Sequence, residues 1–144
     1  MSDAIESQLV HRFFRYLAVT SQSDVASAQL HSTPGQQQLA AMLARELTSL
    51  GLDDIVIDGQ ATVTAVKRAN KPGAPRIGFI AHLDTVDIGL SADIHRQRLA
   101  FTGDDLCLNL RQDIWFRVAE HPEILPYVGQ DILFSAGPER AWRG

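Results

Sequence analysis

The chain has 144 residues, 45% of them apolar, and a formal net charge of −4. This apolar share is too high for a disordered chain, and no apolar run reaches the ~18 residues that a membrane-spanning helix needs. The net negative charge and the scattered basic residues argue against a surface that follows nucleic-acid phosphates. We therefore expect a soluble globular chain whose partners include neither a membrane nor a nucleic acid.

The first residues and the cysteine content indicate a compartment and limit the chemistry. Residues 1–6 (MSDAIE) lack the basic and apolar regions of a secretory signal, so we expect a cytoplasmic location. Cys107 is the single cysteine, which excludes a disulfide within the chain and a thiolate cluster around a metal. A metal site would have to use histidine and carboxylate side chains.

Two amphipathic helices are expected in the first third of the sequence. Ile5, Leu9, Phe13 and Leu17 recur at four-residue spacing, which predicts a helix with a core-facing stripe. Residues 20–31 are polar and are expected to form a loop before the second helix.

The second helix has recognisable start and stop signals. Thr33 is a candidate N-cap, Pro34 suits the first helical position, and Gln36 would complete a capping box. Gly51 follows the last apolar position and is expected to adopt the left-handed conformation that closes a helix.

Several short segments have strand character. Residues 55–57 and 61–66 are rich in β-branched side chains, and residues 106–110 and 130–134 are further candidates. The nearly continuous apolar run at 77–81 (IGFIA) is typical of a strand that is buried on both faces. The predicted class is α/β, with helices packed on a mixed sheet.

Two residues that directly follow this apolar run can carry chemistry. His82 and Asp84 would lie where buried strands open into a crevice, and strand geometry would place both side chains on the same side. A neutral imidazole is a good zinc ligand, and a neighbouring carboxylate can orient the ring or a bound water. The alternative is a polar histidine at a strand end, followed by a turn that Asp84 and Thr85 begin.

Several segments resemble one family in the same order. Residues 32–36 (STPGQ) resemble its Ser-Thr-Glu-Gly-Gln, and residues 50–52 (LGL) resemble the end of the following helix. Residues 77–85 (IGFIAHLDT) resemble Ile-Gly-Phe-Ile-Ser-His-Val-Asp-Thr, and residues 122–131 resemble the segment before the family's next metal motif. Over nearly its whole length the chain resembles peptidase T, the tripeptide aminopeptidase group of the di-zinc exopeptidases.

The resemblance implies roles for two residues and an incomplete site. His82 would be a ligand of one of two zinc ions, and Asp84 would be the acidic catalytic-site residue that supports it. The family's bridging aspartate, glutamate pair, later aspartate and final histidine have no counterparts here. The implied fold is an incomplete N-terminal portion of a zinc-exopeptidase domain over residues 1–134, without the family's second domain, which forms a lid or dimer contact. Such a chain alone would neither retain zinc nor hydrolyse short peptides.

The last ten residues, 135–144, do not resemble the family. Codons permitted for residues 137–144, read one nucleotide later, can spell a segment that resembles the bridging-aspartate motif. We therefore hypothesise a frameshift near Ser135.

Three functional hypotheses remain open at this point. The chain is a portion of a metallo-aminopeptidase that is inactive alone, or partner chains complete its site, or it is a non-catalytic peptide-binding or regulatory module. The sequence does not indicate an oligomeric state. If the remainder of the zinc domain is absent, we also expect unpaired strand edges and aggregation. His11, His31 and His95 are assigned no role, since they lie on a helix or in polar stretches.

Overall fold

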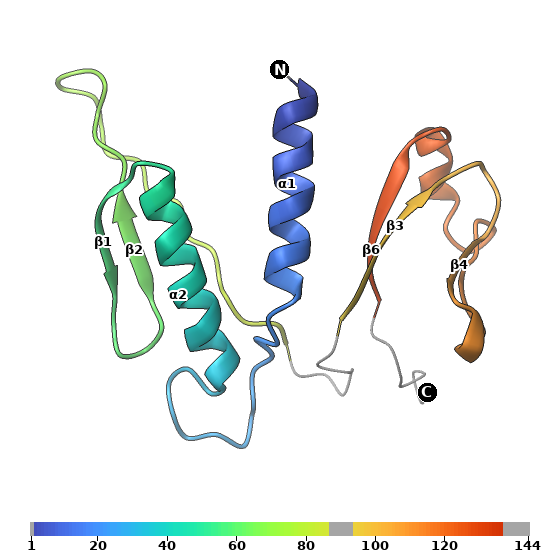
Figure 1. The fold of residues 1–144 in the computed structure, drawn as a ribbon, viewed down its shortest axis with the longest axis horizontal. Coiled ribbons are helices and arrows are strands. Elements are labelled where there is room, and N and C mark those ends of the chain that lie inside the picture. The colour runs from blue at the N-terminus through green and yellow to red at the C-terminus, as the bar shows by residue number, and fades with distance from the viewer. Residues whose placement is uncertain (1, 87–93, 137–144) are drawn as a thin grey trace. The chain divides into compact units, whose positions relative to one another are not determined.

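The computed structural model describes residues 2–86 and 94–136 (Figure 1). Contacts divide the chain into two compact units, residues 19–88 and residues 1–18 with 89–144. Helices and short antiparallel sheets occur together, which confirms the predicted α/β class. The regular elements of the described part are α1 (Ser2–Leu17), α2 (Pro34–Ser49), β1 (Asp53–Ile57), β2 (Val63–Val66), β3 (His95–Ala100), β4 (Leu106–Asn109), β5 (Ile114–Phe116) and β6 (Asp131–Ala136), with 3-10 turns at Leu110–Gln112 and Pro122–Tyr127.

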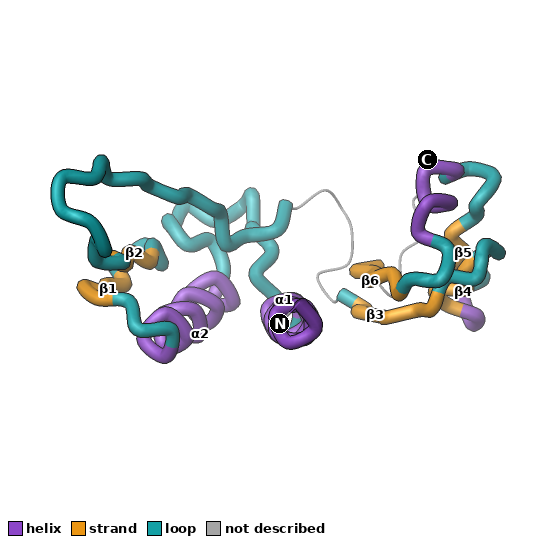
Figure 2. The backbone as a smooth tube through the Cα atoms, turned by 90° about the horizontal axis from the view of Figure 1, so that it is seen from above, coloured by secondary structure: helices purple, strands orange, loops and turns teal. Residues whose placement is uncertain are grey.

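In the unit of residues 19–88, α2 lies alongside an antiparallel hairpin of β1 and β2 (Figures 1 and 2). The two predicted strands are confirmed. Asp58 shapes the connection between them, because one carboxylate oxygen accepts hydrogen bonds from the main-chain nitrogens of Gln60 at 2.9 Å and Thr62 at 2.8 Å. Leu39 and Ala40 of α2 are buried in this unit.

The boundaries of α2 agree with the sequence signals, but its capping does not. Pro34 is the first helical residue, and Gly51 has a φ of +73°, as predicted. Thr33 is the N-cap by position, yet its hydroxyl makes no capping bond and donates to the Gln22 carbonyl at 2.8 Å. The expected capping box is wrong, because the preceding loop lies against the helix start and supplies other partners for both Thr33 and Gln36.

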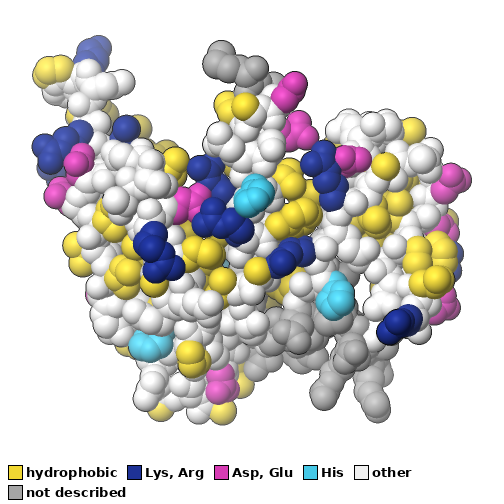
Figure 3. Space-filling model, in the orientation of Figure 1, with side chains coloured by type: hydrophobic (Ala, Val, Ile, Leu, Met, Phe, Trp, Pro, Cys, Tyr) yellow, Lys and Arg dark blue, Asp and Glu magenta, His cyan; other side chains and the backbone are white. Residues whose placement is uncertain are grey.

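The apolar run at 77–81 does not form the predicted buried strand. Residues 74–84 have no regular secondary structure, and the side chains of Ile77, Phe79 and Ile80 are 77%, 95% and 100% exposed. A strand requires a hydrogen-bonded neighbour, and within residues 2–86 and 94–136 no strand pairs with this segment. Figure 3 shows hydrophobic side chains at the surface of the face in view.

The other unit has its core around two antiparallel strand pairs. β3 pairs antiparallel with β6, and β4 pairs antiparallel with β5. Strands at 106–110 and 130–134 were expected and are confirmed as β4 and β6, whereas β3 and β5 were not predicted. The buried residues of this core are Phe101, Leu106 and Ile124, with Leu99, Phe116, Val118, Ile132 and Phe134 packed against them.

The first predicted helix is present as α1, but its apolar stripe is not core-facing. Ile5, Leu9 and Phe13 are exposed, while Val10 and Phe14 are half-buried. Leu17, the fourth member of the stripe, is half-buried. Within the described residues, no helix is long and apolar enough to cross a membrane.

Candidate functional site

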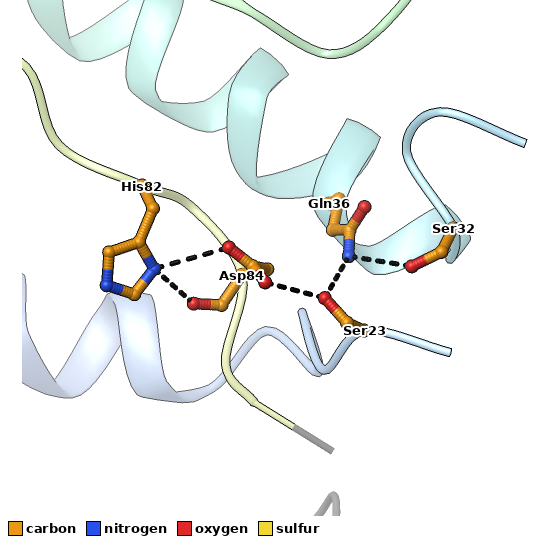
Figure 4. Close-up of polar contacts among 5 residues, drawn as sticks. All are labelled: Ser23, Ser32, Gln36, His82 and Asp84. Atoms are coloured by element: carbon orange, nitrogen blue, oxygen red, sulfur yellow. Dashed lines mark hydrogen bonds and ion pairs between the residues drawn. The ribbon is translucent and has the colours of Figure 1, made fainter. Parts of the chain in front are cut away.

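His82 and Asp84, the two residues singled out from the sequence, are in contact. The Nδ1 atom of His82 lies 2.7 Å from the main-chain oxygen of Asp84 and 3.2 Å from its Oδ1 (Figure 4). Their proximity does not require a paired strand, because the imidazole reaches the aspartate two positions further along an irregular segment. Both residues belong to the unit of residues 19–88.

This contact determines which nitrogen of His82 is free for a ligand. A main-chain carbonyl can only accept a hydrogen bond, so Nδ1 carries the proton that it donates to Asp84. In the neutral ring the lone pair is then on Nε2, the atom that can bind a metal. The side chain is 84% exposed, so this nitrogen is not shielded by a protein core.

The second carboxylate oxygen of Asp84 has its own partner. The Ser23 hydroxyl donates to Oδ2 at 2.6 Å, a short hydrogen bond of the charge-assisted kind. This bond is the largest cause that holds the pKa of Asp84 below its ordinary value of 3.8, and partial burial opposes it. Asp84 is therefore ionised at neutral pH.

Main-chain hydrogen bonds join the two segments that carry Ser23 and Asp84. Gln22 and Thr85 form an isolated parallel bridge. The amide of Ser23 donates to the Thr85 carbonyl at 2.9 Å, and the amide of Thr85 donates to the Ser21 carbonyl at 3.3 Å. The loop expected at residues 20–31 thus contributes directly to the site.

A buried glutamine extends the polar network. Gln36, in the first turn of α2, is 7% exposed, and its Nε2 donates to the hydroxyls of Ser23 at 3.3 Å and Ser32 at 3.2 Å. Figure 4 shows these side chains joined in a row by hydrogen bonds, with His82 and Ser23 on opposite sides of Asp84. Sequence reasoning missed Ser23 and missed this role of Gln36; the signal available was the polar STPGQ segment at 32–36.

The described residues include one candidate metal donor. His82 offers one nitrogen donor with its other nitrogen anchored by a carbonyl and a carboxylate, an arrangement typical of metal-ligating histidines. Zinc in structural or catalytic sites takes three or four protein ligands. Across residues 2–86 and 94–136, no group of three or more His, Cys, Asp or Glu side chains is placed to hold a metal ion. The pair therefore fits one ligand and its support, but not a complete zinc site.

His31 lies in the same unit but does not join this network. It adopts a left-handed φ of +52°, and its buried Nδ1 has no hydrogen-bond partner among the described residues. It lines an open cavity of about 430 Å³ with residues of the N-terminal turns of α2. We assign His31 no role.

The fold and these contacts define an α/β chain that carries a contacting histidine–carboxylate pair. No family model matches the chain. It is 65% identical over 137 residues to a peptidase T-like protein of Yersinia pestis, 57% identical over 133 residues to one of Rhizobium meliloti, and 36% identical over 135 residues to peptidase T of Geobacillus kaustophilus. These alignments cover 92–95% of this chain and 33% of each relative.

The chain is therefore homologous to a part of peptidase T and of peptidase T-like proteins, which confirms the resemblance seen in its sequence. It spans about one third of the length of these curated relatives. Because the alignments cover nearly the whole chain, the matched region contains both His82 and Asp84.

Proposed function

We propose that the chain supplies one zinc ligand and its carboxylate support to the active site of a peptidase T-like aminopeptidase. His82 would bind zinc through Nε2, and Asp84 would orient the imidazole and balance the positive charge. The observation that supports this assignment is the contact of His82 Nδ1 with Asp84, which leaves Nε2 unprotonated and exposed. The resemblance to peptidase T supports the proposed reaction, removal of the N-terminal residue from tripeptides, and the proposed cytoplasmic location.

The chain alone is expected to be inactive. In enzymes of this kind, a pair of zinc ions activates water and polarises the scissile carbonyl. His82 by itself provides a single donor where about three or four are needed. We therefore expect the purified chain neither to retain stoichiometric zinc nor to hydrolyse tripeptides.

The proposed domain assignment follows the resemblance. Residues 1–134 would be the peptidase-like portion, and residues 135–144 a tail that a frameshift produced. Ser135 and Ala136 form the end of β6, opposite Arg96 and His95, while residues 137–144 lie outside the described part of the structure. Sequencing the DNA would test the frameshift: a single uninterrupted frame that continues into unrelated coding sequence would disprove it.

A chimeric enzyme tests the proposed function. Residues 1–134 would replace the aligned third of the Yersinia pestis relative, which is 65% identical to this chain. We expect the chimera to contain zinc and to release N-terminal residues from tripeptides. The His82→Ala variant should lose about one bound zinc per chain and most of the activity. His11→Ala, an exposed histidine of α1, is the matched control and should retain both.

Two results would overturn the proposal. Zinc content and hydrolysis that are unchanged in the His82→Ala chimera would exclude this residue as a ligand. Peptide binding by the isolated chain that is insensitive to a chelator would instead favour the non-catalytic binding module.

A further inference from the structure

We propose that Ser23, held in place by Gln36, is the positioning residue for the Asp84–His82 pair. This inference rests on the proposed function, since it assigns Ser23 a role in that same site. It adds a residue from the segment at 20–31, for which the sequence indicated only a loop. Ser23 acts through Asp84 and is not itself a ligand.

The directions of the hydrogen bonds give Ser23 a defined orientation. A serine hydroxyl has one proton, and here it is donated to Asp84 Oδ2 at 2.6 Å. The Gln36 amide can only donate through Nε2, so it occupies a lone pair of the Ser23 oxygen at 3.3 Å. The hydroxyl therefore accepts from one side and donates to the other, which points its proton at the carboxylate.

Gln36 provides a rigid support for this arrangement. Its side chain is buried, and a buried amide without hydrogen-bond partners is unfavourable. The Nε2 atom avoids this cost by donating to Ser23 and Ser32, and the residue itself belongs to the first turn of α2. Through Ser23 and Gln36, the Asp84 carboxylate is thus anchored to helix α2.

Main chain and side chain hold different parts of Asp84. The Gln22–Thr85 bridge fixes the backbone beside Asp84, and with it the carbonyl that His82 Nδ1 contacts. Ser23 fixes the carboxylate, whose Oδ1 is the second acceptor for His82. Removing only the Ser23 hydroxyl should release the carboxylate while the bridge persists, which makes the role separable from folding.

The same arrangement explains a glycine in the STPGQ segment. A Cβ atom on Gly35 would lie 1.6 Å from the main-chain oxygen of Thr20. The loop passes this closely over the start of α2, and it thereby brings Ser21 and Ser23 to the site. Within the segment, Gly35 leaves room for the loop at Thr20. Gln36, which also bonds to Ser32, then holds Ser23 of that loop by a hydrogen bond.

The test measures the side-chain conformation of Asp84 in the full 144-residue chain by NMR. Three-bond couplings between Hα and Hβ report whether its χ1 angle has a single value or an average. We expect one rotamer in the unmodified chain, averaged couplings in Ser23→Ala, and a single rotamer again in Ser23→Thr, which restores a hydroxyl.

A second serine of the same loop provides the matched control. The Ser27 hydroxyl accepts a local hydrogen bond from the Gln29 amide at 3.2 Å, so Ser27→Ala also removes a loop hydroxyl and one of its hydrogen bonds. This variant should leave the couplings of Asp84 unchanged. Averaged couplings in Ser27→Ala would show that any loosening of the loop releases the carboxylate, and the specific role of Ser23 would be lost.

The amide signals of Gln22 and Thr85 report separately whether the bridge is intact. If Asp84 keeps one rotamer in Ser23→Ala while these signals are unchanged, the proposal is overturned. Gln36→Met, which keeps the volume and removes the amide, should also average the couplings, though Ser23 retains its hydroxyl. Loss of the bridge signals in both variants would assign Ser23 and Gln36 a purely structural role and would likewise overturn the proposal.

This experiment needs neither zinc nor a peptide. A failure of the proposed function would appear in the zinc content and hydrolysis of the chimera, whereas a failure of the positioning role would appear in the couplings of Asp84.

Discussion

At the scale of single residues, the contact between His82 and Asp84 has two acceptors of different kinds. The main-chain oxygen is nearer to Nδ1, at 2.7 Å, than the carboxylate oxygen at 3.2 Å. The main-chain acceptor is present whatever side chain stands at position 84. The protonated nitrogen of His82 should therefore be set by the backbone, and the carboxylate should refine the tilt of the ring.

This division predicts the outcome of Asp84→Asn. The neutral imidazole should keep its proton on Nδ1 in both the unmodified chain and the variant, because the carbonyl still accepts it. Long-range ¹H–¹⁵N correlations of the ring distinguish the two tautomers. An Asp84→Asn chain whose neutral His82 carries the proton mainly on Nε2 would contradict the prediction.

The sequence predicted the residues of this pair and missed those that hold it. His82 and Asp84 stand two positions apart, directly after an apolar run, and this local motif together with the resemblance to peptidase T singled them out. Ser23 and Asp84 are 61 positions apart, and no local pattern reports a contact of that separation. The zinc-ligand role of His82 and the catalytic role of Asp84 stay predictions for the chimera to test.

At the scale of elements, the packing of the loop against the start of α2 requires a glycine at position 35. Alanine is favoured over glycine in helices by about 1 kcal/mol, but in Gly35→Ala the new Cβ would overlap the Thr20 carbonyl at 1.6 Å. The overlap should dominate and lower the free energy of unfolding by about 1–3 kcal/mol. Chemical denaturation checks this, with Gly59→Ala as control, since a Cβ there meets no atom within 4 Å. Equal stabilities of the two variants would refute the argument.

The hydrogen bonds of Asp105, which directly precedes β4, predict that the stability of the chain depends on pH. Asp105 accepts hydrogen bonds from the Val118 amide at 2.8 Å and from Arg117 at 2.9 Å. The Val118 amide first, and then Arg117, hold the pKa of Asp105 below its ordinary value of 3.8. A lowered pKa in the folded state means that the stabilisation is present above pH 3.8 and is lost as the pH falls through the folded-state value.

The variant Asp105→Asn isolates this contribution. Its difference in unfolding free energy from the unmodified chain should be constant above about pH 5 and should shrink toward lower pH. Denaturant titrations across the acid range measure that difference. A difference that grew on acidification would show that the sign is wrong.

Local patterns predicted most elements but not their surroundings. Apolar periodicity and helix signals located α1 and α2, β-branched runs located β1 and β2, and short apolar segments indicated β4 and β6. β3 (His95–Ala100) was missed because its sequence, HRQRLA, has few β-branched or apolar side chains and is defined by its pairing with β6. The run at 77–81 was misjudged for the converse reason: its side chains suit a strand, but no described strand pairs with it.

At the scale of the whole molecule, that unpaired run should govern self-association. The side chains of Ile77, Phe79 and Ile80 are largely exposed. Burial of one phenylalanine contributes about 1.5–3 kcal/mol, so Phe79→Ser should raise the dissociation constant for self-association by roughly tenfold or more. Sedimentation velocity over a concentration series measures this. Val25→Ser removes a single exposed apolar side chain elsewhere and should have little effect, whereas equal effects would exclude a specific contribution of the run.

The parallel bridge between Gln22 and Thr85 also has a consequence for the time at which the site can form. During synthesis on the ribosome, α2 and the β1–β2 hairpin emerge before Thr85, so each can fold while Ser21 and Ser23 still lack their main-chain partner. Closing a loop across about sixty residues costs more entropy than forming either local element. We expect the histidine–carboxylate pair to be assembled last in its unit, after the helix that supports it is already in place.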